Sequence, residues 1–128
     1  MRVGLVLSGG GARGIAHVGV MKALTEMGIQ FSVISGTSAG AVAGAYFAAG
    51  CSFNEMMERL YAMRILRKLR PAWGRSGLLR LDVIESFVKE GIPSDNFETL
   101  KIPLIVAATN LHTGNTEYFS SGQLSRPV

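Results

Sequence analysis

The chain has 128 residues, 48% of them hydrophobic and 17% charged, and this composition indicates one globular domain with its own core rather than a disordered segment. Its single cysteine, Cys51, excludes an internal disulfide, fits a reducing cytoplasmic compartment and is expected to be a buried structural thiol. The net charge is +4, no apolar run reaches transmembrane length, and the apolar start is too short for a secretory signal.

The first 28 residues predict a strand, a glycine loop and a helix. Residues 2–7 form a strand-like run, and residues 8–14 (Ser-Gly-Gly-Gly-Ala-Arg-Gly) follow at once. Apolar residues then recur mostly every three or four positions, which predicts a helix with one face on a core. These residues are Ile15, Val18, Met21, Ala23, Leu24 and Met27. Gly28 is the predicted C-cap.

A G-x-S-x-G pentapeptide, residues 36–40, follows a second apolar run at 31–35 and precedes small residues at 41–49 that read as a helix. Strand, sharp turn and helix are the setting of a nucleophile elbow, in which the turn lifts the serine hydroxyl clear of the backbone. The N–H groups that open the helix can stabilise a developing oxyanion. The pentapeptide therefore predicts Ser38 as a nucleophile.

The order of these segments predicts the start of a parallel α/β sheet with right-handed crossovers. In such sheets ligands bind beyond the carboxyl ends of the strands. Both glycine motifs fall at that end, on the first two strands, so we expect them to converge on one site.

The glycine loop also spells G-x-G-x-x-G (Gly9, Gly11, Gly14), which is a dinucleotide-binding pattern. That use requires an acidic residue near the end of the second strand to hold a ribose hydroxyl. Residues 34–37 are Ile-Ser-Gly-Thr, without a carboxylate, and no Gly-Lys-Ser/Thr follows the loop. An oxyanion hole beside the elbow is the better interpretation, with Arg13 adding positive charge or holding the loop.

Residues 9–14 and 36–40 together resemble the G-G-G-x-R-G and G-T-S-A-G motifs of patatin-like phospholipases, and residues 102–114 are similar to that family's central strand and hairpin. The resemblance implies a three-layer α/β/α fold with a mainly parallel sheet, of which residues 1–128 form the N-terminal portion. It also implies hydrolysis of lipid acyl esters by a serine–aspartate dyad, without metal or cofactor.

Carried onto this sequence, the resemblance implies a nucleophile, an oxyanion loop and an elbow. Ser38 is the nucleophile. The oxyanion loop consists of Gly9, Gly10, Gly11, Arg13 and Gly14, and the elbow of Gly36, Thr37, Ala39 and Gly40. A non-catalytic lipid- or acyl-binding module with the same fold is the alternative.

The dyad aspartate of that family lies in an Asp-Gly motif, and this chain contains none. Asp82 is expected to be a first-turn helix charge and Asp95 a turn or cap residue. We therefore expect the N-terminal part of a longer enzyme. Alone it would be inactive, and it would form a homo-oligomer or pair with a complementing C-terminal fragment.

The two histidines suggest a weaker alternative. A serine–acid–histidine order is satisfied by Ser38, either aspartate and His112, which falls in a predicted hairpin turn. The resemblance needs no histidine, however. His17, in the first helical turn after the glycine loop, is expected either to stabilise that loop or to be partly buried.

Residues 59–80 contain seven basic residues and no acidic one, interleaved with large apolar residues. The overlapping residues 56–73, the basic segment, suit peripheral contact with an anionic membrane. The alternative is a surface helix packed on the domain, followed by a loop. Nothing else in the chain resembles a nucleic-acid-binding module, so no nucleic-acid partner is expected.

Overall fold

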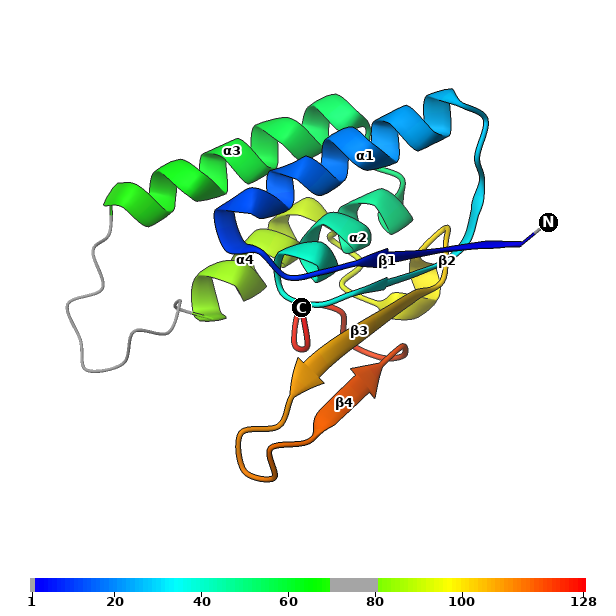
Figure 1. Cartoon of the computed structure of the whole chain (residues 1–128). Coiled ribbons are helices and arrows are strands. Elements are labelled where there is room, and N and C mark those ends of the chain that lie inside the picture. The colour runs from blue at the N-terminus through cyan, green and yellow to red at the C-terminus, as the bar shows by residue number, and fades with distance from the viewer. Residues whose placement is uncertain (1, 70–80) are drawn as a thin grey trace.

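The computed structural model describes residues 2–69 and 81–128, with side chains over 2–62 and 84–128. Four strands form one sheet in the order β1-β2-β3-β4 (Figure 1). The first three, β1 (Val3–Leu7), β2 (Phe31–Gly36) and β3 (Leu104–Thr109), are parallel, and β4 (Thr116–Phe119) returns antiparallel to β3. The predicted α/β class and mainly parallel sheet are confirmed.

Helices fill the connections. The 3₁₀ helix η1 (Gly11–Gly14) and α1 (Ile15–Glu26) join β1 to β2. Between β2 and β3 lie α2 (Ala39–Ala49), α3 (Phe53–Leu69), α4 (Leu81–Gly91) and the 3₁₀ helix η2 (Phe97–Thr99). Helix α1 ends as predicted, because Gly28 adopts a φ of +81° that reverses the chain.

The helices cover one face of the sheet. Both crossovers step across the sheet in the same direction, so a right-handed connection puts their helices on the same side. Figure 1 shows α1, α2 and α3 on that side of β1 and β2. On the sheet, Val6 is 81% exposed and Tyr118 is 72% exposed. The described residues thus build the sheet and one helical layer of the expected three-layer fold.

The core lies between the sheet and α2, whose residues 40–46 and 48 are buried. Gly44 brings α2 close to the sheet: a methyl group on it would meet the side chains of Ile34 and Leu104 at 3.1 and 3.3 Å. Tyr46 is fully buried, its hydroxyl donates to the Phe87 carbonyl at 2.7 Å, and burial raises its pKa. A helix that is apolar on all sides is expected in such an interior position.

Three predicted burial assignments need correction. Ala23 is exposed, because it follows the buried Met21 by two positions and therefore lies on another side of α1. Met27 is 74% exposed, because α1 ends at Glu26 and Met27 lies past the last turn that faces the core. Cys51 is only partly buried at the far end of α2, although it packs against the core. Burial raises the pKa of its thiol.

Helix α3 contains the start of the basic segment. Met56 is completely buried and Leu60 packs against the core, whereas Met57 and Tyr61 are exposed. The side chains of Arg64, Arg67 and Lys68 and the whole of residues 70–73 lie outside the described residues. The first turns of α3 therefore pack on the domain. Within the described part of the chain, no helix is long and apolar enough to cross a bilayer.

Candidate active site

Ser38 lies between β2 and α2 in a backbone conformation that L-residues rarely adopt. Its φ is +51° and its ψ is −126°, and the residue is exposed. Its carbonyl accepts two hydrogen bonds in the first turn of α2, from the N–H groups of Ala41 at 2.9 Å and Val42 at 3.1 Å. The strained turn thus presents the Ser38 side chain at the amino end of a helix, as a nucleophile elbow requires.

The glycines on either side of Ser38 allow the strand and helix to cross closely. A methyl group on Gly36 would lie 2.6 Å from the Gly40 carbonyl oxygen, and one on Gly40 would overlap the Leu7 carbonyl. The Thr37 N–H donates to the same Leu7 oxygen at 3.2 Å. Residues 36–40 therefore pack tightly against the end of β1, where the glycine loop begins.

The glycine loop contacts the elbow at two points. A methyl group on Gly9 would lie 3.4 Å from the Ser38 Cβ, and one on Gly14 would lie 2.5 Å from the Ala39 Cβ. Gly11 has a φ of +52°, and the Arg13 N–H closes a turn on the Gly10 carbonyl at 3.0 Å. The structure thus brings together the two motifs that the sequence placed on neighbouring strands.

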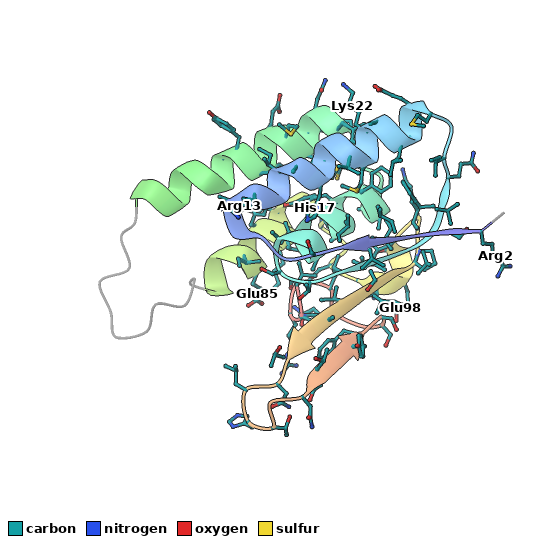
Figure 2. The ribbon with its side chains drawn as sticks, in the orientation of Figure 1. Arg2, Arg13, His17, Lys22, Glu85 and Glu98 are labelled. Carbon is teal, nitrogen blue, oxygen red and sulfur yellow. The ribbon has the colours of Figure 1, made fainter. Side chains whose placement is uncertain are left out.

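A side chain from α1 reaches the start of the loop. The Nε2 atom of His17 lies 2.8 Å from the Ser8 carbonyl oxygen, and Figure 2 shows His17 and Arg13 at the end of α1 nearest the loop. The Arg13 residue is exposed. The position of His17 in the first turn suggested a role in the loop, but sequence alone did not identify the Ser8 carbonyl as its partner.

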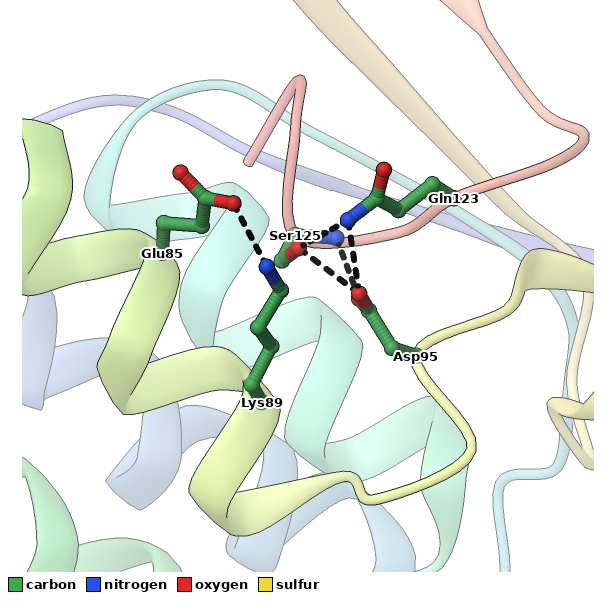
Figure 3. A network of polar contacts seen from close by, with 5 residues as sticks. All are labelled: Glu85, Lys89, Asp95, Gln123 and Ser125. Carbon is green, nitrogen blue, oxygen red and sulfur yellow. Dashed lines mark hydrogen bonds and ion pairs between the residues drawn. The ribbon is translucent and has the colours of Figure 1, made fainter.

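Asp95 is tied to the C-terminal loop (Figure 3). Its carboxylate accepts from the Ser125 N–H at 2.7 Å, the Ser125 hydroxyl at 2.9 Å and the Gln123 amide at 3.0 Å. Burial opposes ionisation, but these hydrogen bonds outweigh it and hold the pKa of Asp95 below its ordinary value. Nothing in the sequence pattern linked these residues.

The remaining candidate acid and base are Asp82 and His112. Asp82 is the second residue of α4, as expected for a first-turn charge, and its side chain is outside the described residues. His112 is exposed in the β3–β4 turn, where its backbone N–H donates to the Asn110 Oδ1 atom at 2.9 Å. Because the carboxylate of Asp95 bonds Ser125 and Gln123, the structure does not support a triad through Asp95.

A sequence model of patatin-like phospholipases matches residues 5–126, which include both glycine motifs, β3 and the hairpin. This chain belongs to the patatin-like phospholipase family. The family assignment agrees with the resemblance of the two motifs and gives the dinucleotide alternative no support.

Relatives of this patatin-like chain include an uncharacterized NTE family protein of Mycobacterium tuberculosis, 39% identical over 99% of the chain and 36% of the relative. A lysophospholipase of Aspergillus fumigatus is 35% identical over 98% of the chain and 9% of the relative. The chain therefore spans about a third of the mycobacterial relative and under a tenth of the fungal one.

Solved structures show the same fold. The type III effector ExoU superposes with a TM-score of 0.68 at 20% identity, covering 98% of this chain and 39% of that one. VipD from Legionella pneumophila superposes with a TM-score of 0.62 at 18% identity, covering 99% and 41%. At these identities the likeness establishes the patatin-like fold alone.

Proposed function

We propose that this chain carries the nucleophile and oxyanion hole of a serine acyl hydrolase that acts on lipid esters, a phospholipase or lysophospholipase. The observation that carries the proposal is the strained, exposed Ser38 beside the glycine loop, where a methyl group added to Gly9 would lie 3.4 Å from the Ser38 Cβ. Backbone strain of this kind persists where the surrounding structure enforces it, often at functional sites. The family and the lysophospholipase relative supply the substrate class.

In the proposed reaction the Ser38 Oγ attacks the ester carbonyl carbon while a base takes its proton. N–H groups of residues 9–11 and of the opening of α2 stabilise the oxyanion. Collapse breaks the C–O bond to the alcohol, which leaves with a proton, and water then hydrolyses the acyl-enzyme. We propose an aspartate outside these 128 residues as the base, because the family's dyad aspartate lies in an Asp-Gly motif that this chain lacks, and Asp95 bonds Ser125.

Contact between the basic segment, residues 56–73, and a membrane surface stays a prediction. If it faces lipid, vesicles containing anionic lipid bind the protein more tightly than neutral vesicles, and salt weakens that binding. Neutralising Arg64, Arg67 and Lys68 together would remove the preference. Equal binding to both vesicle types would favour packing alone.

A fluorophosphonate probe tests the proposed nucleophile. We expect the full-length protein to be labelled on the peptide containing Ser38 and to hydrolyse a short-chain nitrophenyl ester. Ser38→Ala abolishes both, and Ser32→Ala, at an exposed position of β2, preserves both. Labelling that survives Ser38→Ala would exclude Ser38 as the nucleophile. A wild-type protein that binds lipid but shows neither reaction would be the non-catalytic binding module.

A further inference from the structure

We propose that His17 is a positioning residue for the oxyanion hole: it fixes the peptide plane whose N–H belongs to Gly9. The inference rests on the proposed hydrolase function and adds to it a side chain that does not touch the substrate. The contact that carries it is the 2.8 Å hydrogen bond between the His17 ring and the Ser8 carbonyl oxygen.

The direction of this hydrogen bond follows from its partners. A backbone carbonyl oxygen only accepts, so the Nε2 atom of His17 must carry the proton. The imidazole is then either the neutral Nε2–H tautomer or the imidazolium, and both can donate.

A peptide unit transmits this restraint to the next residue. The Ser8 C=O and the Gly9 N–H belong to one planar trans unit and point in opposite directions. Holding the oxygen therefore fixes the direction of the Gly9 N–H. Gly9 is also the loop residue whose added methyl group would lie 3.4 Å from the Ser38 Cβ.

The loop needs such a restraint because of its composition. Residues 9–11 are three exposed glycines, which have the greatest backbone freedom of any residue and no side chains to anchor them. The Ser8 carbonyl oxygen also lies against Gly40, where an added methyl group would meet it at 2.6 Å. His17 and the elbow thus hold the same carbonyl group from two elements.

Helix α1 is a firm support for His17. Val18, the next residue, and Met21 are buried in the core, with 1% and 0% of their surface exposed. A functional group held by a packed helix is placed more accurately than one held by a loop. The His17 ring therefore links the rigid core to the flexible glycines.

The test compares His17→Leu, His17→Gln and His17→Asn in the full-length protein, using a soluble nitrophenyl ester. The leucine variant loses the donor and we expect kcat to fall about 10- to 100-fold at unchanged KM, the scale of a misplaced catalytic group. Glutamine reaches with its amide nitrogen to about the place of Nε2 and restores kcat, whereas the shorter asparagine does not. Lys22→Leu, at an exposed position of the same helix, is the matched control and keeps the wild-type kcat.

Melting temperatures separate positioning from a structural role. An unchanged Tm in His17→Leu, together with the kcat restored in His17→Gln, supports the proposal. If His17→Leu does not fold, the comparison of His17→Gln with His17→Asn decides. A wild-type kcat in His17→Leu or His17→Asn, or no rescue by glutamine, would overturn the role of His17 while leaving Ser38 intact. A wild-type protein without Ser38-dependent turnover would overturn the proposed function itself, and this inference with it.

Discussion

The α-carbon of Gly40 lies against the backbone carbonyl of Leu7, so closely that a methyl group on Gly40 would overlap the Leu7 oxygen. Gly40 is the second residue of α2, the helix that follows Ser38, and Leu7 ends the strand that leads into the glycine loop. This contact therefore sets the distance between the candidate nucleophile and the candidate oxyanion hole.

Gly40→Ala should destabilise the domain, because the added methyl group would collide with the Leu7 carbonyl. A backbone carbonyl cannot change rotamer to relieve the collision as a side chain could. Overpacking of this kind costs about 1–3 kcal/mol of unfolding free energy. Gly19→Ala is the matched control: nothing lies within 4 Å of its added methyl group, and alanine in a helix should stabilise by roughly 0.5–1 kcal/mol. Urea unfolding measures both, and equal stabilities would contradict the contact.

Ser38→Gly should give a more stable protein than Ser38→Ala, although both are inactive. Glycine adopts the observed φ of +51° without strain, whereas alanine keeps the strain. We expect a difference of about 1 kcal/mol in unfolding free energy, at the low end of what such strained residues cost. At Ser32 in β2, the glycine variant should instead be less stable than the alanine variant. If Ser38→Gly is less stable than Ser38→Ala, the backbone of Ser38 is not strained.

Gly10→Val should lower turnover while the fold survives, because a Cβ at Gly10 finds only ordinary contacts, 3.7 Å from the Arg13 Cβ and 3.8 Å from the Gly14 nitrogen. If crowding removes one oxyanion donor, the barrier rises by roughly 2.7–4 kcal/mol. Ester kinetics and a melting curve on the same sample make the measurement. Wild-type turnover in a folded variant would exclude this part of the loop from the oxyanion hole.

The Asp95 network should make stability depend on acid pH. The pKa of Asp95 lies below its ordinary 3.8, so its contribution is complete above that value and is lost as pH falls through the lower folded-state pKa. Asp95→Asn tolerates the φ of +43° but loses the charge, and should cost roughly 1 kcal/mol at pH 7. The difference in unfolding free energy between wild type and Asp95→Asn should be smaller at pH 3 than at pH 7. An equal difference at both pH values would contradict the linkage.

The 128-residue chain produced alone should self-associate and show no more esterase activity than its Ser38→Ala variant. Val6 and Tyr118 expose apolar surface on the sheet, and β1 is an edge strand. Val6→Lys should reduce association without harming the fold, because that side chain is 81% exposed. Light scattering and an ester assay on one sample test both statements. A monomer with Ser38-dependent turnover would indicate a base within the chain.

The sequence by itself determined the elements around the candidate site, because their signals are local. The strand expected within residues 102–114 is β3, Leu104–Thr109, and the glycine at 28 ends α1. The pentapeptide around Ser38 needs only its neighbouring strand and helix to be recognised. The local pattern misplaced Ala23, Met27 and Cys51, because burial depends on how a helix lies and where it ends against its neighbours.

Tertiary structure alone decided which residues meet. The contacts of His17 with Ser8 and of Asp95 with Ser125 join segments whose separation in the chain carries no periodic signal. The exposed side chain of Val6 follows from the direction of both crossovers, a property of strand order that no single segment encodes. The chemical groups of a residue can be read from the sequence, but its partners depend on how the sheet and helices pack. That packing brings the two glycine motifs together at one candidate site.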